Sequence, residues 1–235
     1  MTKTLAQARE YAERLASVAW SDRVQPFVIP SFTAIAVVAD ELGPRSRVLV
    51  GAQDGHWEDA GAWTGEVSMA QVADAGARLV EIGHSERREF FGETDERVNL
   101  KVLAALRNGL LPLVCVGEDA EYRRAGSAVD VVRAQLLAAL AEVPQDARVL
   151  VAYEPVWAIG EHGTPASPDD VVDVIRELAQ IAGAGRPILY GGSVNQSNAA
   201  DLLAVPEVSG LFVGRAAWQV DGFLALADLA ASRQA

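Results

Sequence analysis

One carboxylate, that of Glu154, stands where a base could act beneath a movable lid. It directly follows Val149-Leu-Val-Ala-Tyr153, an apolar run with the length and composition of a buried strand. Pro155 cannot extend a central strand, and Gly160 and Gly163 lie beyond a short apolar segment. An acid at the end of a buried strand, under such a loop, is typical of a general base beneath a lid. A Glu that only caps the strand or forms a salt bridge is the structural alternative, and this segment alone leaves both open.

Six motifs found in one order add a resemblance to this pattern. The segment AYEPVWAIG, residues 152–160, resembles the catalytic glutamate and lid of triosephosphate isomerase. The other motifs are GAQ at 51–53, WTGEVS at 63–68, GHSERR at 83–88, CVGE at 115–118 and YGGSVN at 190–195. The resemblance runs from the first residues to about residue 230, so it implies the family's fold and chemistry for nearly the whole chain.

The resemblance implies which residues act on the substrate. Glu154 would be the base that moves a proton between adjacent carbons, and His84 a neutral imidazole that donates to the substrate oxygen. That pairing of Glu and neutral His is the known arrangement of triosephosphate isomerase itself. Ser85 would help to hold Glu154 while the lid is open. Glu86 resembles the family's buried acid beside a catalytic lysine, or it stabilises a helix N-terminus.

A phosphate site is expected at the ends of the last strands, where backbone N–H groups of barrel enzymes bind anions. Gly160, Ser193 and Gly214 match the family's phosphate-contacting positions, with Gly191 and Gly192 shaping the turn, and the backbone N–H of Arg215 is expected to bind there too. Ordinary turn chemistry is the alternative for the glycines. The lid itself would consist of Pro155, Val156, Trp157, Ala158 and Ile159.

The long loop over residues 53–66 predicts a homodimer. In the resembled family this loop enters a partner subunit, and the residue that matches Thr64 reaches the partner's active site. Trp63 and Glu66 would join that interface, and His56 and Trp57 lie in the same loop. Two tryptophans in an exposed loop also favour a covered surface.

Strand-like and helix-like segments alternate along the chain, as βα units around a parallel sheet do. Strands are expected at 25–29, 47–52, 78–82, 111–116, 148–153, 187–190 and 209–213. Helices are expected at 5–19, from about 31, near 68, and at 94–108, 119–141, 168–182, 196–203 and 219–232. The charged residues of the helices at 94–108 and 119–141 are interpreted as solvent-facing. We therefore expect one α/β domain over residues 1–235, a TIM (β/α)8 barrel with its first strand missing.

The start of the chain departs from the resembled family. There the first strand ends in an N-W-K-M-N-like segment that supplies a catalytic lysine and an asparagine, whereas Thr2 stands at the position of the last asparagine. Lys3 falls two positions late, so the catalytic role is not assigned to it. Either the sequence begins too late, through truncation or a mis-assigned start codon, or the barrel has an open seam and a changed function.

Three further departures concern the substrate. The loop DGHWEDAGAW at 54–63, the segment EHGTPASP at 161–168 and Arg215 in place of a second glycine resemble the branch of L-erythrulose 1-phosphate isomerases. The expected reaction is an aldose–ketose type isomerisation through an enediolate, converting L-erythrulose 1-phosphate to D-erythrulose 4-phosphate. The alternatives are ordinary triosephosphate isomerase of glycolysis, and a non-catalytic phosphate-binding barrel that lacks the lysine.

Composition excludes several other classes of protein. The net charge of -12 argues against nucleic acid as a partner, and no apolar run is long enough to span a bilayer. The N-terminus lacks the apolar stretch of a signal peptide, and the single cysteine, Cys115, fits a reducing cytoplasm. The three histidines lie in separate loops and the cysteine is unpaired, so neither a metal nor any other cofactor is expected.

Overall fold

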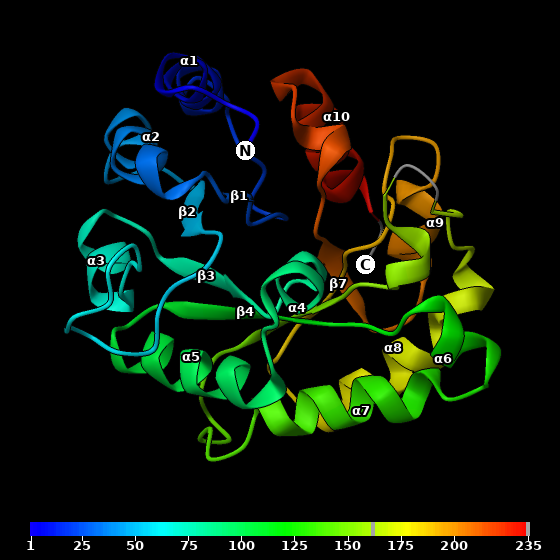
Figure 1. The fold of residues 1–235 in the computed structure, drawn as a ribbon. Coiled ribbons are helices and arrows are strands. Elements are labelled where there is room, and N and C mark those ends of the chain that lie inside the picture. The colour runs from blue at the N-terminus through cyan, green and yellow to red at the C-terminus, as the bar shows by residue number, and fades with distance from the viewer. Residues whose placement is uncertain (161–162, 234–235) are drawn as a thin grey trace.

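Seven parallel strands form one curled sheet in the computed structural model, which describes residues 1–160 and 163–233 (Figure 1). The strands lie side by side in their order along the chain. They are β1 (Phe27–Val28), β2 (Leu49–Ala52), β3 (Leu79–Ile82), β4 (Leu111–Val116), β5 (Leu150–Tyr153), β6 (Ile188–Tyr190) and β7 (Val208–Leu211). Among the described residues the sheet thus has one strand fewer than a (β/α)8 barrel, as expected from the sequence.

Helices connect the strands and surround the sheet (Figure 1). They are α1 (Leu5–Ala16), α2 (Ile35–Leu42), α3 (Met69–Asp74), α4 (Ser85–Phe91), α5 (Asp95–Arg107), α6 (Ala120–Arg124), α7 (Ala128–Ala139), α8 (Pro168–Ala182), α9 (Ala199–Ala204) and α10 (Val220–Ser232). Short 3-10 helices are η1 (Phe32–Ala34), η2 (Val156–Ala158) and η3 (Arg215–Ala217). The first and last helices pack together through Tyr11 and Phe223, whose ring centroids are 6.3 Å apart.

The two faces of the sheet bury different sets of apolar side chains. The inner set fills the barrel and consists of Leu79, Leu113, Cys115, Ala152 and Leu189. The outer and larger set joins the sheet to its helices. Alternate residues of a strand point to opposite faces, so each short strand serves both sets. At the two ends of the sheet, Phe27 and Phe212 stack with ring centroids 6.3 Å apart.

The prediction of one long helix was wrong. The segment 119–141 forms two helices, α6 and α7, because Gly126 adopts a φ of +73° between them. That left-handed conformation favours glycine and ends a helix. By contrast α8 has the expected bounds, with Pro168 in its first turn and Asp170 accepting from the N–H of Ser167 at 2.9 Å. None of the helices in the described residues is both long and apolar enough to cross a membrane.

Candidate active site

Glu154 and His84 meet at the carboxyl end of the sheet. Glu154 directly follows β5, and His84 follows β3 after Gly83 and caps the N-terminus of α4. The Nε2 atom of His84 lies 2.9 Å from Oε1 of Glu154, and the N–H of Ser85 donates to Oε2 at 3.0 Å. Glu154 is only 2% exposed. The structure thus brings together the expected base, the expected electrophile and the expected accessory residue.

Two opposed sets of contacts decide whether the imidazole ring of His84 is neutral or charged. The N–H of Glu86 donates to Nδ1 at 3.2 Å, which places the proton of a neutral ring on Nε2, facing Glu154. Burial also disfavours the charged ring, but the hydrogen bond and charge of Glu154, with the charges of Glu81 and Glu86, raise the pKa of His84 to about 9. Contact with Glu154 is thus the largest of the influences that favour the imidazolium.

Glu86 does not occupy the buried position expected of it. Its side chain is 72% exposed, and its carboxylate lies 3.9 Å from Nδ1 of His84. Glu86 instead stands in the first turn of α4, where a negative charge stabilises the helix N-terminus. The position of Glu86 thus fits the alternative role, which is to stabilise a helix N-terminus.

The buried acid beside His84 is Glu81, which sequence reasoning missed. It lies on β3 and is 7% exposed, with Oε1 at 3.7 Å from Nε2 of His84. The available signal was an acidic residue inside the apolar strand LVEI, three positions before the histidine. A charged residue at a buried strand position is rare enough to mark a functional candidate.

A second missed acid, Glu118, holds the start of the lid. It is 1% exposed and accepts from the hydroxyl of Tyr153 at 3.1 Å and from Nε1 of Trp157 at 2.7 Å. The guanidinium of Arg123 lies 4.0 Å from the ring centroid of Trp157. These contacts fix η2, and with it the expected lid residues Pro155 to Ile159, above the end of β5.

The expected phosphate-binding residues gather around the lid. The hydroxyl of Ser193 donates to the carbonyl of Ala158 at 2.5 Å, and Nη2 of Arg215 donates to the carbonyl of Gly160 at 2.6 Å. The side chain of Arg215, whose place the sequence left open, thus joins the loop after β7 to the lid. Gly214 has open space around its Cα, whereas a Cβ on Gly192 would lie 2.2 Å from the hydroxyl oxygen of Tyr190. Residues 161 and 162 of the EHGTPASP segment lie outside the described residues.

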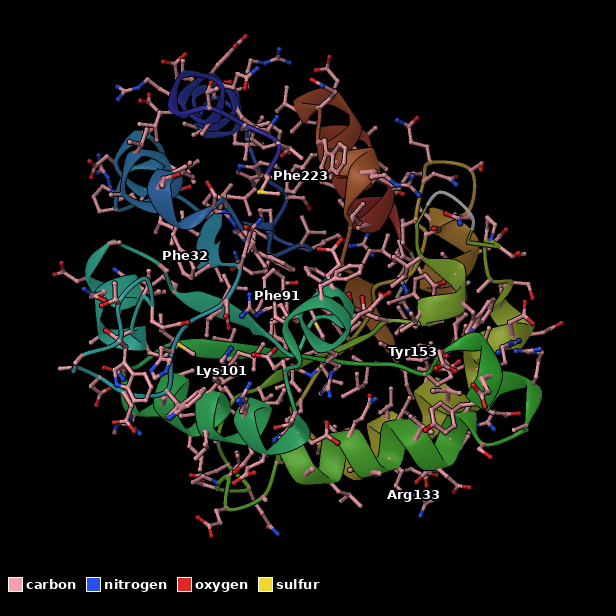
Figure 2. The ribbon with its side chains drawn as sticks, viewed as in Figure 1. Phe32, Phe91, Lys101, Arg133, Tyr153 and Phe223 are labelled. Carbon is pink, nitrogen blue, oxygen red and sulfur yellow. The ribbon has the colours of Figure 1, made fainter. Side chains whose placement is uncertain are left out.

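The charged residues of α5 are not all solvent-facing, so that expectation was wrong for Lys101 (Figure 2). Lys101 is 5% exposed, donates to Asp54 at 2.6 Å and also contacts Glu93. Arg87 pairs with Asp54 at 2.8 Å, and Glu93 accepts from the N–H of Gly83 at 3.1 Å. This network of two acids and two bases ties the start of the long loop to the residue before His84.

Both lysines of the chain are engaged outside the Glu154–His84 pair. Lys101 belongs to the buried network, and Lys3 donates to the carbonyl of Trp218 at 2.6 Å and lies 4.8 Å from the ring centroid of Tyr11. The charged groups within 4 Å of His84 in the described residues are Glu154, Glu81 and Glu86, all acidic.

The long loop presents an aromatic stack. His56 is buried, with its ring centroid 4.1 Å from that of Trp57 and 4.6 Å from that of Trp63. Trp63, Thr64 and Glu66, expected at a dimer interface, are all exposed. Trp63 therefore covers His56 with one face while its remaining surface is free to contact another molecule.

The amino-terminal end of the sheet also carries a cavity. The cavity of about 810 Å³ opens at this end of the sheet, near Leu49 and Leu111, where β2 and β4 start, and near Arg148, which precedes β5. Because barrel enzymes carry their chemistry at the carboxyl ends of the strands, this cavity is remote from the candidate active site. No group of three or more potential metal ligands occurs in residues 1–160 and 163–233.

Comparisons with known proteins agree on one family. The sequence model described as triosephosphate isomerase matches residues 1–230. A protein of Mycolicibacterium smegmatis named L-erythrulose-1-phosphate isomerase is 52% identical over 238 residues, which cover 99% of this chain and 90% of that protein. Proteins with the same name from Mesorhizobium japonicum and Rhizobium etli are 51% and 52% identical, each over 95% of this chain, and over 91% and 87% of their own lengths.

Proposed function

This chain belongs to the triosephosphate isomerase family, and we propose that it converts L-erythrulose 1-phosphate to D-erythrulose 4-phosphate through an enediolate. The observation that carries the proposal is the contact of 2.9 Å between Glu154 and His84 at the carboxyl end of the sheet. The names of the relatives at about half identity support the choice of a four-carbon substrate.

The proposed reaction moves one proton between neighbouring carbons. Glu154 removes the proton from C3 of the bound ketose, and the electron pair passes through the C2–C3 bond to the carbonyl oxygen. The Nε2–H group of His84 donates to the enediolate oxygen that carries the resulting negative charge. Glu154 then returns the proton to C2, and the hydroxyl proton of C3 transfers to the C2 oxygen. The carbonyl has moved from C2 to C3, so both forms of the tetrulose are ketoses; with a triose the same steps interconvert a ketose and an aldose.

The substrate must separate the two residues before this chemistry starts, because Glu154 and His84 are in direct contact. Separation removes the nearby carboxylate that raises the pKa of His84. The N–H of Glu86 remains at Nδ1 and favours the neutral ring with its proton on Nε2. Binding of the substrate would thus produce the neutral donor that the reaction requires.

Phosphate binding is proposed at the backbone of Gly160, Ser193 and Gly214, with the turn at Gly192 and the guanidinium of Arg215 beside it. The contact of Arg215 with the lid carbonyl of Gly160 supports this arrangement. A cation near backbone N–H groups would attract the anion locally, which a chain of net charge -12 requires. Closure of the lid would then exclude water from the enediolate.

We also propose that the protein is a cytoplasmic homodimer. The exposed Trp63, Thr64 and Glu66 of the long loop provide the contact surface, and the family resemblance supports its burial in a partner. The single buried cysteine is compatible with a reducing compartment.

Ordinary triosephosphate isomerase is the second candidate, because the family description that matches residues 1–230 bears that name. The ratio of kcat/KM for L-erythrulose 1-phosphate to that for dihydroxyacetone phosphate decides between the two. A ratio of about ten or more, equal to about 1.4 kcal/mol in the transition state, supports the tetrulose, and a ratio below one contradicts it. Phosphate binding without turnover of either substrate would indicate the third reading, a non-catalytic barrel.

A further inference from the structure

Glu81 holds a carboxyl group that the proposed mechanism does not use. Along β3, Leu79 packs in the inner apolar set and Val80 and Ile82 in the outer one, so Glu81 faces the inside of the barrel. It is 7% exposed and pairs in register with Leu113 of β4. A carboxyl group in this place is costly unless a partner compensates for its burial.

No described residue supplies that partner. The nearest charged atom, Nε2 of His84, is 3.7 Å from Oε1 of Glu81, too far for a hydrogen bond, and it faces Glu154 at 2.9 Å. The other buried acids differ in this respect: Asp54 is paired with Lys101 and Arg87, and Glu118 accepts two hydrogen bonds. Glu81 is therefore a buried acid with unused hydrogen-bonding capacity next to the catalytic pair.

The expected orientation of the bound substrate also favours Glu81 as a contact. The expected phosphate site lies on the lid after β5 and on the loops after β6 and β7, whereas Glu81 and His84 belong to β3 and the loop after it, two to four strands away. In L-erythrulose 1-phosphate the C4 hydroxyl is at the opposite end of the carbon chain from the phosphate. With the central carbons between Glu154 and His84, C4 points away from the phosphate, toward the β3 side of the site.

Glu81 and Glu154 lie on the same side of the site, because one carboxylate oxygen of each is close to Nε2 of His84, at 3.7 Å for Glu81 and 2.9 Å for Glu154. On β4, which lies between β3 and β5, the inner residue Cys115 is in register with Ala152 of β5. The Cys115 thiol has its pKa raised by burial and by the charges of both Glu154 and Glu81, as expected of a group close to the two of them.

The protonation state of Glu81 suits a hydroxyl ligand. Burial raises the pKa of its carboxyl group to about 8; the charge of His84 opposes this, and those of Glu154, Glu86 and Asp54 add to it. At neutral pH the group therefore retains its proton, so it can donate one hydrogen bond and accept another. A neutral group also avoids repelling the negative enediolate beside it.

We propose that Glu81 selects the four-carbon substrate by hydrogen bonding its C4 hydroxyl group. The inference rests on the proposed function and names the residue that recognises the additional carbon. A triose phosphate has no hydroxyl at this position and would leave Glu81 unpaired, which makes the site discriminate against it.

The test compares two substrates across three proteins: the unaltered chain, Glu81→Gln and Glu81→Leu. For Glu81→Leu we expect kcat/KM for L-erythrulose 1-phosphate to fall about 10- to 100-fold, while that for dihydroxyacetone phosphate changes less than about threefold. Glu81→Gln, which retains a donor and an acceptor at nearly the same size, should preserve more of the tetrulose preference. Glu13→Leu, a matched change at an exposed position of α1, should alter neither value.

The outcomes separate this inference from the proposed function. If the unaltered protein prefers the triose, the proposed function fails and the inference fails with it. If the unaltered protein prefers the tetrulose and that preference survives in Glu81→Leu, only the inference fails. Equal losses on both substrates in both Glu81 variants would also overturn it, because they would show that Glu81 supports His84 and does not select the substrate.

Discussion

Nε2 of His84 lies 2.9 Å from Oε1 of Glu154, so the two groups proposed to act on one substrate contact each other directly. Glu154 therefore influences the charge of His84. Glu154 favours the imidazolium, and the N–H of Glu86 at Nδ1 favours the neutral ring. Substrate binding would replace the contact of His84 with Glu154 by a contact with a substrate oxygen. The effect of Glu154 on the pKa of His84 can be tested without turnover.

We predict that Glu154→Gln lowers the pKa of His84 well below its value of about 9. The neutral amide removes the charge that stabilises the imidazolium, while burial continues to disfavour it. An NMR titration of the imidazole measures the change. Glu86→Gln is the control, because its side chain is 72% exposed and its influence is smaller, so the pKa should decrease less. An equal or larger decrease in the control would contradict the assignment.

Exchange of the substrate's C3 proton with solvent tests Glu154 as the base. In deuterated water we expect Glu154→Gln to slow the exchange by about 100-fold or more, because an amide cannot accept the proton. Ser85→Ala is the comparison, since the backbone N–H of Ser85, and not its hydroxyl, donates to Glu154. That variant should retain most of the exchange. Unchanged exchange in Glu154→Gln would remove Glu154 from its role.

Replacing Lys101 should destabilise the fold. Lys101→Met leaves Asp54 and Glu93 buried with less compensation, and breaking such a buried pair costs about 3–5 kcal/mol of the free energy of unfolding. Arg176→Met is the matched control, because its pair with Asp173 is exposed and contributes about 0.5 kcal/mol or less. Denaturant unfolding of both variants measures the difference. Similar values would show that the network contributes little to stability.

The proposed dimer predicts that an added charge in the long loop separates the subunits. Thr64→Arg should shift the protein to monomers in sedimentation velocity, because the charge would have to be buried in the interface. Ala134→Arg, a similar change at an exposed position of α7, should leave the mass unchanged. A monomeric unaltered protein would contradict the dimer, and an intact dimer in Thr64→Arg would place the interface elsewhere.

Much of this architecture follows from local sequence signals. Glu154 and His84 each follow an apolar strand directly, so their place at the carboxyl end of the sheet could be predicted from the alternation of strands and helices. The bounds of α8 follow from its Ser-Pro-Asp-Asp start. The contact between Glu154 and His84 itself requires the curl of the sheet, which brings β3 and β5 together.

What could not be predicted depends on contacts between distant residues. Lys101 lies on an amphipathic helix and looks solvent-facing until Asp54, 47 positions earlier, is placed beside it. Likewise, Glu81 is buried because of the face of β3 on which it lies, and Glu86 is exposed because of the face of α4 on which it lies. The break between α6 and α7 at Gly126 was readable in principle, because glycine is a frequent helix terminator.

Arg215 provides the last prediction, because it links the loop after β7 to the lid. Its guanidinium donates to the carbonyl of Gly160 at 2.6 Å, and its side chain is exposed. Arg215→Ala should therefore weaken substrate binding, raising KM about tenfold through loss of a charge-assisted hydrogen bond and of the local cation, with little effect on the free energy of unfolding. Arg215→Lys retains the charge but not the planar fork, so it should restore part of the affinity. If KM were unchanged in Arg215→Ala, the contact with Gly160 would have no part in binding the phosphate.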